Sequence, residues 1–457
     1  MRIRTTTRRE FLKKTAGAAV SGPLVLTSLT RRAGAAPANE RIALGIIGPG
    51  QQGFGLLKRF MRIPEVQMVA ACDVSMTRRG YAAKVINEHY AEARKAGSFQ
   101  GAKAYRDFRD LLAIQDIDAV VIAVPDHWHA IVAMTACKAG KDVYCEKPLS
   151  LTIHEAHQMM LAARKYDRVF QTGSQQRTEF NGYFRRACEL VRNGRIGKIE
   201  KVLVSVKVTN WIEHSKPCDL PSEPVPAGFD WDFWLGPAPQ RGYNKILAPA
   251  GIPDEPPDDQ KDKIAWYKNY PDWRNYREFS GGSMTDFGAH HFDIAQWGLA
   301  MDDSGPVEVI PAKDGQPMTF KYPNGVIMEK VDDINGEAEG SHGVKFIGSE
   351  GWVEVTREFL HTKPENLVDK PVPPDGVHFP EVEDHKRDFI DCVMSRKRPI
   401  ADVEIGARSV TVCHLGNLAY WHNKTLRWDP KNWRFANEED NRLLDRPKRA
   451  PWTLPAL

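Results

Sequence analysis

Short apolar runs alternate with helix-like segments through the first part of the chain. Each run has the length of a buried strand and is followed by turn or polar residues. The alternation predicts βαβ units, and therefore a doubly wound parallel sheet with helices on both faces, over residues 36–175. The expected strands are Ile42–Ile47, Val66–Cys72, Ala119–Val124, Val143–Cys145 and Val169–Thr172. The expected helices are Phe54–Met61, Thr77–Arg94 and His129–Ala139.

The pattern changes in residues 176–457. Lys198–Val208 alternates apolar and polar residues like a half-buried strand, and Val344–Val355 holds a Gly-Ser-Glu-Gly turn between apolar flanks, which is typical of a hairpin. Gly406–Trp421 has the pattern of a late amphipathic helix. We expect a second α/β domain here, with an open, mostly antiparallel sheet. Residues 212–279, rich in Pro, Trp, Tyr and charge, predict a long irregular insertion that helps to build a site.

Residues 1–35 have the pattern of an export signal. Residues 7–13 read Thr-Arg-Arg-Glu-Phe-Leu-Lys, as in a twin-arginine signal, and an apolar stretch and a small-residue cleavage site follow. A membrane helix is the alternative, but the stretch over residues 16–29 is short and Pro23 interrupts it. We expect an exported, periplasmic protein without a membrane span after cleavage. Twin-arginine export carries folded proteins, which suggests a cofactor loaded before export.

Charge and cysteine usage exclude some classes of function. The chain has 63 basic and 59 acidic residues, but residues 1–35 hold eight basic and one acidic residue, which leaves 55 against 58 and a net charge of −3. A near-neutral protein of this kind has no electrostatic basis for binding nucleic acid. The seven cysteines are scattered without a C-x-x-C pair, which argues against a zinc ribbon or a redox dithiol.

A glycine-rich motif follows the first expected strand. Gly48-Pro49-Gly50-Gln51-Gln52-Gly53 fits G-x-G-x-x-G at the opening of a helix, as in a Rossmann dinucleotide site. Gly48 allows the tight turn, Gly50 lets the pyrophosphate approach the backbone, and Gly53 lets helix and strand pack closely. We expect the cofactor to be bound here by Gly48, Gly50, Gln52 and Gly53. The alternative is a turn of purely structural use.

Asp73, at the end of the second expected strand, predicts the identity of the cofactor. A carboxylate there binds the adenosine ribose 2′-hydroxyl and repels a 2′-phosphate, so we expect NAD. Arg78 and Arg79 lie nearby in the sequence and leave NADP possible.

Two further strand ends carry candidate cofactor contacts. Parallel strands present their carboxyl ends at one edge of a sheet, where doubly wound folds bind ligands. The candidates are Pro125, Asp126 and His129 after one strand, and Glu146 and Lys147 after the next. His129 could instead cap its helix.

Together with the glycine loop and Asp73, two motifs resemble the Gfo/Idh/MocA oxidoreductases. They are Glu146-Lys147-Pro148 and the downstream segment Gly281–Asp293, which contains Asp-x-Gly-x-His. The resemblance implies that the catalytic set is Lys147, Asp286 and His290. A histidine suits removal of a hydroxyl proton, and a lysine suits stabilisation of a developing alkoxide.

Each catalytic candidate has a plainer interpretation. Lys147 could be a surface residue, Asp286 could cap a helix that begins near Gly288, and His290 could be a buried histidine without a catalytic role. A metal cluster is a further alternative, although the family pattern accounts for its residues without a metal, so we expect none. Its ligands would be Asp286, His290, His291 and Asp293.

Substrate contacts are expected from two regions, the end of the last expected strand and the surroundings of the insertion. The candidates there are Gln176, Arg177, Arg277 and His291. Aromatic, arginine and asparagine side chains suit sugar binding, although ordinary loop packing is the alternative. The insertion and its flanks offer Trp211, Tyr243, Trp273, Arg274 and Asn275.

The resemblance implies an enzyme that acts on a sugar, polyol or glycoside. We expect hydride transfer between a secondary alcohol and tightly bound NAD(H). The alternative is an NAD-dependent glycosidase that works by transient oxidation and elimination, and a sugar-binding protein without catalysis is a third possibility. Family members pair through the open face of the second sheet, so a homodimer or homotetramer is expected, with Lys198–Val208 as a candidate interface.

Overall fold

The computed structural model describes residues 41–208, 211–253, 270–334, 342–382 and 384–457. All of them belong to one unit, Pro37–Leu457. The expected export signal lies outside these residues. Within the described ranges, no helix is both long enough and apolar enough to cross a membrane.

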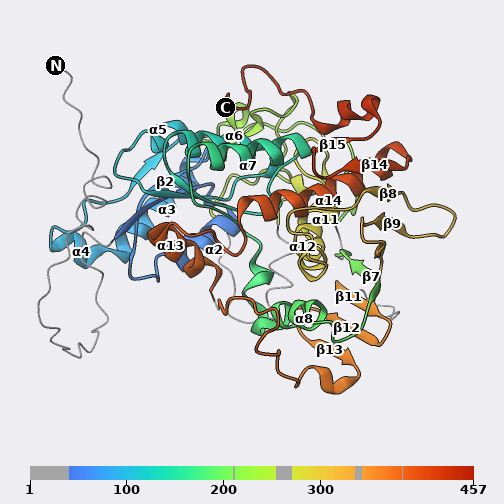
Figure 1. Ribbon diagram of the computed structural model, residues 1–457. Coiled ribbons are helices and arrows are strands. Elements are labelled where there is room, and N and C mark those ends of the chain that lie inside the picture. Colours follow the sequence, from blue (N-terminus) through green and yellow to red (C-terminus); the bar gives the residue numbers. More distant parts are fainter. Residues whose placement is uncertain (1–40, 209–210, 254–269, 335–341, 383) are drawn as a thin grey trace, which may run out of the picture. The chain divides into compact units, whose positions relative to one another are not determined.

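The first sheet has six parallel strands in the order β3-β2-β1-β4-β5-β6 (Figure 1). This order confirms the predicted doubly wound sheet, and β3 is a short edge strand that the apolar pattern does not predict. The strands are β1 (Ile42–Ile47), β2 (Val66–Cys72), β3 (Lys103–Tyr105), β4 (Ala119–Ile122), β5 (Asp142–Cys145) and β6 (Phe170–Thr172).

Helices cover both faces of this sheet. Leu44 and Ile46 of β1 belong to one hydrophobic cluster and Ile47 to another, because successive side chains of a strand point to opposite faces. The predicted helix 77–94 is divided at Tyr90 into two. The helices are α2 (Gln51–Phe60), α3 (Met76–His89), α4 (Ala91–Lys95), α5 (Phe108–Leu112), α6 (Asp126–Lys138) and α7 (Ile153–Lys165).

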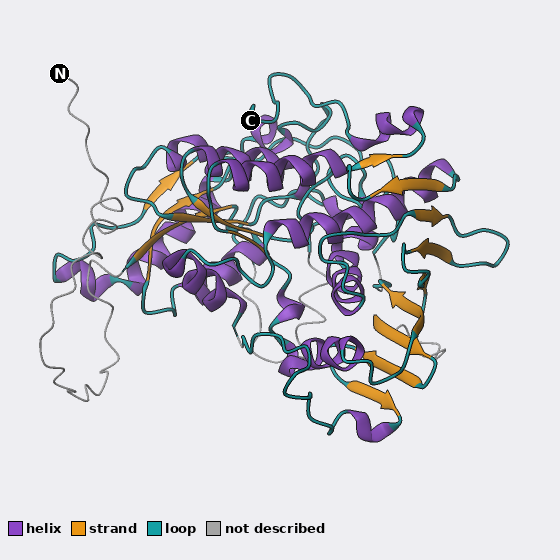
Figure 2. Ribbon diagram, viewed as in Figure 1, coloured by secondary structure: helices purple, strands orange, loops and turns teal. Residues whose placement is uncertain are grey.

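The second sheet has nine strands in the order β13-β12-β11-β7-β10-β9-β8-β14-β15 (Figure 2). Only β7 and β10 pair in parallel, so the prediction of a mostly antiparallel sheet is confirmed, as is the predicted hairpin, β11–β12. The strands are β7 (Ile199–Ser205), β8 (Glu308–Ile310), β9 (Met318–Lys321), β10 (Ile327–Val331), β11 (Gly343–Gly348), β12 (Gly351–Val355), β13 (Leu360–Lys363), β14 (Leu426–Asp429) and β15 (Arg434–Phe435).

Two late helices pack against the first half of the chain. Asp402, the N-cap of α14 (Val403–His422), pairs with Arg164 of α7 at 2.5 Å. Phe389 and Ile390 of α13 (His385–Ser395) belong to the hydrophobic cluster that contains residues of β1 and α2. The helices and single turns of this half are η1 (Gln175–Arg177), η2 (Phe180–Gly182), α8 (Tyr183–Arg192), α9 (Trp231–Leu235), η3 (Asp272–Asn275), α11 (Ser283–Asp286), α12 (Gly288–Gly298), η4 (Glu365–Leu367), α13 (His385–Ser395), α14 (Val403–His422) and η5 (Glu438–Leu444).

The predicted insertion, residues 212–279, holds little regular structure in its described part but has a core of its own. Apart from α9 and η3 it is turns and loops, and its aromatic side chains form a separate hydrophobic cluster. This small core gives the insertion a defined shape beside the first sheet. Its largest members are Phe229, Trp231, Trp234, Tyr243, Trp273, Tyr276 and Phe279.

Candidate functional site

A cavity of about 1690 Å³ lies at the carboxyl edge of the first sheet and is also lined by the second domain and the insertion. Doubly wound sheets bind dinucleotides at this edge. Most of the predicted cofactor and catalytic residues line it. They are Gly48, Gly50, Gln52, Asp73, Pro125, Asp126, Glu146, Lys147, Asp286 and His290.

The glycine loop has the geometry that a pyrophosphate requires. Gly48 has φ +83°, and a Cβ at this position would lie 2.8 Å from the carbonyl oxygen of Ala123. Gly50 is the extended residue before α2, and it lines the cavity together with Gln51 and Gln52. The start of α2, where backbone N–H groups are free to bind a phosphate, therefore lies at the cavity wall. Gly53 does not line the cavity, but a Cβ there would lie 2.1 Å from the Gly48 carbonyl oxygen, which fits the predicted role in helix–strand packing. The loop therefore fits NAD.

The arginines after β2 are occupied by backbone carbonyls. Arg78 Nε donates to the Gly251 oxygen at 3.0 Å, and Arg79 Nη1 donates to the Asp73 oxygen at 3.2 Å. Asp73 itself lines the cavity and accepts a hydrogen bond from Ser75 N at 2.7 Å. With an acid facing the ribose position and both guanidinium groups engaged, the site favours NAD over NADP.

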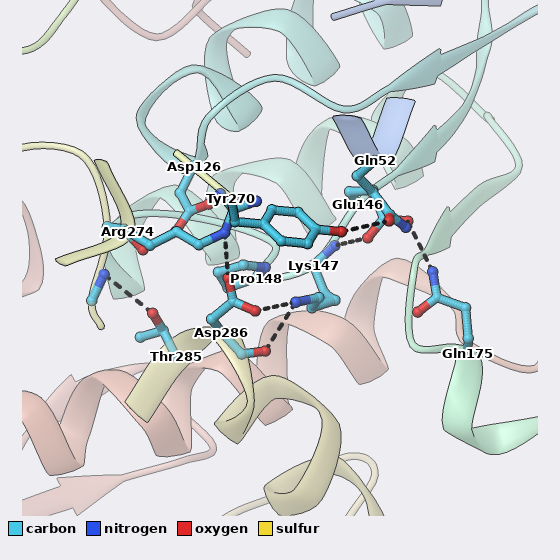
Figure 3. A network of polar contacts seen from close by, with 12 residues as sticks. Gln52, Asp126, Glu146, Lys147, Pro148, Gln175, Tyr270, Arg274, Thr285 and Asp286 are labelled. Carbon is cyan, nitrogen blue, oxygen red and sulfur yellow. Dashed lines mark hydrogen bonds and ion pairs between the residues drawn. The ribbon is translucent and has the colours of Figure 1, made fainter. Parts of the chain in front are cut away.

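Glu146 is the centre of a polar network beside the glycine loop (Figure 3). Its Oε1 accepts hydrogen bonds from Gln52 at 3.1 Å and from Gln175 at 2.8 Å, and its Oε2 accepts one from the Lys147 backbone at 3.2 Å. Tyr270 of the insertion donates to Gln52 at 3.4 Å. Burial raises the pKa of Glu146, and Lys147 and these donors oppose the rise. The network fixes the turn that carries Lys147.

Two cations hold Asp286 (Figure 3). Lys147 Nζ pairs with Asp286 Oδ1 and also donates to the Asp286 carbonyl at 3.1 Å, while Arg274 Nε donates to Oδ2 at 2.9 Å. Burial alone would raise the pKa of Asp286, but Lys147 and Arg274 hold it below its usual value. Asp286 is thus ionised at neutral pH. It ends α11 and makes no cap for α12, so the capping alternative is wrong.

His290 lies in the first turn of α12 and faces the same cavity. Its side chain is buried, yet Nδ1 has no hydrogen-bond partner among the described residues. Burial, with the nearby cations Lys147 and Arg357, puts its pKa well below the usual value. A neutral imidazole with an open nitrogen can accept a proton, so the interpretation as a satisfied core histidine does not fit.

Asp126 is a further buried carboxyl group that lines the cavity. Ser280 Oγ donates to its Oδ2 at 2.6 Å, and burial raises its pKa to about 8. His129, predicted as a cofactor contact, does not line the cavity. Its ring nitrogens lie 2.8 Å from the Pro148 oxygen and 2.9 Å from the Val124 oxygen, so it joins two strand-end loops instead.

The predicted substrate residues do not line the cavity. Arg177 is 1% exposed and bonds Asp293 at 2.7 Å and Asp302 at 2.6 Å, because a buried guanidinium requires carboxylate partners. Arg277 lies over the ring of Trp421 at 4.3 Å. These two predictions are therefore corrected to structural roles.

Gln176 and His291 are corrected in the same way. Gln176 Nε2 lies 3.4 Å from His291 Nδ1, and Gln176 Oε1 accepts a hydrogen bond from Arg357 Nε at 3.0 Å. His291 Nε2 lies 3.1 Å from His342 Nδ1. The pair forms a layer of polar contacts behind the cavity wall and supports His342 and Arg357, which do line it.

The insertion and the second sheet supply cavity residues that the sequence alone does not identify. Of the aromatic candidates, Trp211 and Trp273 line the cavity with Arg274, whereas Tyr243 and Asn275 do not. Tyr270 lines it in the same region, and its place in the aromatic-rich insertion was the only available signal. Four more lining residues belong to no recognisable motif: Phe180 and Asn181 of η2, and His342 and Arg357 in loops beside β11 and β12.

The metal alternative is not supported by the geometry. Asp293 bonds Arg177 and also accepts a hydrogen bond from Ser409 at 2.7 Å, whereas Asp286 is held by Lys147 and Arg274. The two carboxylates therefore face different cations.

All seven cysteines are free thiols, six of them buried.

Comparison with known families matches both domains. One model, described as an oxidoreductase family with an NAD-binding Rossmann fold (Gfo/Idh/MocA), matches residues 42–174, and the model of that family's C-terminal alpha/beta domain matches residues 263–454. The chain belongs to the Gfo/Idh/MocA oxidoreductase family. Its first domain is the NAD-binding fold of that family, as the glycine loop and Asp73 predict.

Individual relatives match only part of the chain. An uncharacterised oxidoreductase, YrbE, of Bacillus subtilis strain 168 is 32% identical over 158 residues, which cover 35% of this chain and 42% of the relative. An alpha-N-acetylgalactosaminidase of Shewanella oneidensis is 30% identical over 175 residues, 35% of this chain and 37% of the relative. The matches thus span less than half of these relatives' own lengths.

A solved structure shares the fold over most of the chain. An aldose–aldose oxidoreductase from Caulobacter crescentus matches with a TM-score of 0.54 and 17% identity, over 85% of this chain and 100% of that one. The likeness shows a common fold.

Proposed function

We propose that this Gfo/Idh/MocA protein is an exported enzyme that transfers a hydride between a secondary alcohol of a sugar or polyol and tightly held NAD(H). The observation that carries the proposal is the shared cavity: Lys147, Asp286 and His290 line the same space as the glycine loop. The sugar substrates named for the relatives, an aldose and an N-acetylgalactosaminide, support the substrate class.

The residues divide the chemistry of alcohol oxidation among them. NAD, when bound, would accept the hydride that leaves the alcohol carbon with both electrons of its C–H bond. The hydroxyl proton passes to His290, whose imidazole is neutral at pH 7 and whose Nδ1 has no partner among the described residues. Lys147 Nζ donates a hydrogen bond to the same oxygen and stabilises its developing negative charge. Asp286, which Arg274 holds, keeps the ammonium group in place.

Export and assembly complete the proposal. The twin-arginine pattern of residues 7–13 supports passage to the periplasm in the folded, NAD-loaded state. A compartment without a supply of free NAD favours an enzyme that keeps its cofactor. We also infer a homodimer or homotetramer formed through the second sheet, because such a sheet leaves one face for a partner.

Product analysis tests this function against the redox glycosidase. The purified protein is incubated with aldoses, polyols and aryl glycosides, and the products are separated by mass spectrometry. Oxidised or reduced sugars are the expected products. Release of the aglycone without net oxidation would identify the glycosidase mechanism instead, and no turnover of any compound by an NAD-loaded protein would favour a binding protein.

A further inference from the structure

The insertion reaches the part of the cavity where Asp73 would hold the adenosine ribose. We call residues 247–253 the cover segment. Asp73 and Arg78 line the cavity, and so does the cover segment, which Arg78 contacts. The cover segment members that line the cavity are Leu247, Ala248, Pro249, Gly251, Ile252 and Pro253.

Side chains of the Rossmann loop hold the cover segment directly. Arg78 donates from Nη2 to the Pro249 oxygen and from Nε to the Gly251 oxygen at 3.0 Å. Ser75 Oγ donates to the Ala250 oxygen at 2.7 Å. Three consecutive carbonyl groups of the cover segment are thus bound by Ser75, which caps α3, and by Arg78 in the first turn of α3.

The neighbouring part of the insertion is attached to the same loop through backbone groups. Met76 N donates to the Gly228 oxygen at 2.8 Å, and Asp230 N donates to the Val74 oxygen at 3.2 Å. These contacts place the insertion at the adenosine end independently of Arg78.

The cover segment is also anchored from behind. Leu247 is fully buried in the aromatic cluster of the insertion, and Tyr243 Oη donates to the Ala248 oxygen at 3.1 Å. Tyr243 does not line the cavity, so it supports the segment without facing the nucleotide position.

We propose that the cover segment and Arg78 close over the adenosine half of the NAD site, so that they must separate before the dinucleotide can enter or leave. The inference rests on the proposed use of NAD and gives its tight retention a structural basis. A nucleotide bound at Asp73 would lie in the same cavity as the cover segment, and the hydrogen bonds to the three carbonyls oppose the separation of the segment from Arg78 and Ser75.

Association and dissociation rates of NADH test the cover, with energy transfer from tryptophan to the bound nucleotide as the signal. In Arg78→Ala we expect both rates to rise by about tenfold or more. The substitution removes the two hydrogen bonds from the guanidinium group to the cover segment, and hydrogen bonds from a charged donor are stronger than those from a neutral one. Both rates should rise together, since a cover hinders entry and exit alike. Tyr243→Phe should shift both in the same direction by a smaller factor. Arg79→Ala is the matched control, because among the described residues Arg79 donates to the backbone oxygens of Asp73 and Val74 and to none of the cover segment, and it should leave both rates unchanged.

A faster dissociation with unchanged association in Arg78→Ala would overturn the cover, because it would show a simple contact between Arg78 and the nucleotide. Unchanged rates in both Arg78→Ala and Tyr243→Phe would also overturn it. ADP-ribose contains the adenosine half, and its rates are followed through its competition with NADH. They should respond to Arg78→Ala as those of NADH do, and the rates of nicotinamide mononucleotide, measured in the same way, should not. These rates are measured without a sugar substrate, so a failure of the proposed sugar chemistry would leave them unaffected and is detected separately.

Discussion

Two buried carboxyl groups that line one cavity differ in charge at neutral pH. Asp286 lies against Lys147 and Arg274 and stays ionised, whereas Asp126 accepts a hydrogen bond from the Ser280 hydroxyl, and burial raises its pKa to about 8, so that it holds its proton at neutral pH. The environment of each group decides its state, which is the usual way in which one cavity separates an ionic role from a neutral one.

Lys147→Ala should abolish most turnover and leave NAD binding intact. The substitution removes the donor to the reacting oxygen and leaves Asp286 paired with Arg274 alone. We expect kcat to fall by about 10² to 10³ while the Kd for NAD stays within a few-fold. Steady-state kinetics and a nucleotide titration measure the two quantities, with Lys138→Ala on the far end of α6 as a control. Turnover close to that of the unmodified enzyme would exclude Lys147 from the chemistry.

Asp126→Asn should stabilise the protein in a pH-dependent way. The folded-state pKa of Asp126 is raised above its unfolded value, so the native state holds more protons and wild-type stability falls as pH rises from about 4 to about 8. The slope for one such group is at most about 1.4 kcal/mol per pH unit. An amide removes this term, so the variant's Tm should exceed the wild-type Tm at pH 8 by more than at pH 4. An equal difference at both values would show that Asp126 titrates normally.

At the scale of elements, the pattern of apolar residues predicts most of the two sheets. The strands of the first sheet follow directly from their buried runs, and the β11–β12 hairpin follows from its turn. The pattern misses β3, with its exposed Lys103 and Ala104, because an edge strand carries no apolar signal. It cannot predict that α13 returns to the first sheet, because that packing depends on contacts more than 300 residues apart, such as the ion pair of Arg387 with Glu65.

For the candidate site, too, local motifs predict some residues, whereas others depend on contacts between distant segments. The motif after β5 and the Asp-x-Gly-x-His motif predict Lys147, Asp286 and His290 as one set, and all three line one cavity. Arg177 is expected in the cavity because it follows the last strand of the first sheet, whereas its partners Asp293 and Asp302, which are distant in sequence, hold it in the protein interior. Arg274, as a second cation on Asp286, becomes evident only when the insertion folds against α11.

Arg177→Leu tests the structural role of this arginine between η1 and α12. It leaves Asp293 buried without its cation, and breaking a buried pair in this way costs about 3–5 kcal/mol of unfolding free energy. Urea unfolding should show this loss, and Arg94→Leu on the exposed surface of α4 should show almost none. An unchanged unfolding free energy with a raised KM would restore Arg177 as a substrate contact.

At the scale of the whole molecule, the candidate active site is a joint product of three parts. The first sheet supplies the glycine loop and Lys147, the second domain supplies Asp286 and His290, and the insertion supplies Arg274 and the cover segment. Such a site is complete only in the folded chain. That requirement agrees with the export proposed from residues 7–13, because the twin-arginine route carries proteins that have already folded.

The most direct test of the account is the nucleotide content of the full-length protein after purification from its producing cells. The protein is denatured, and the supernatant is analysed by mass spectrometry, while the near-ultraviolet absorbance of reduced nicotinamide is followed in the native sample as sugars are added. We predict about one NAD(H) per chain, whose absorbance rises or falls with a sugar or polyol. A protein that contains no nicotinamide and takes up none, or one whose bound NAD(H) never responds to any sugar, polyol or glycoside, would contradict the central claim.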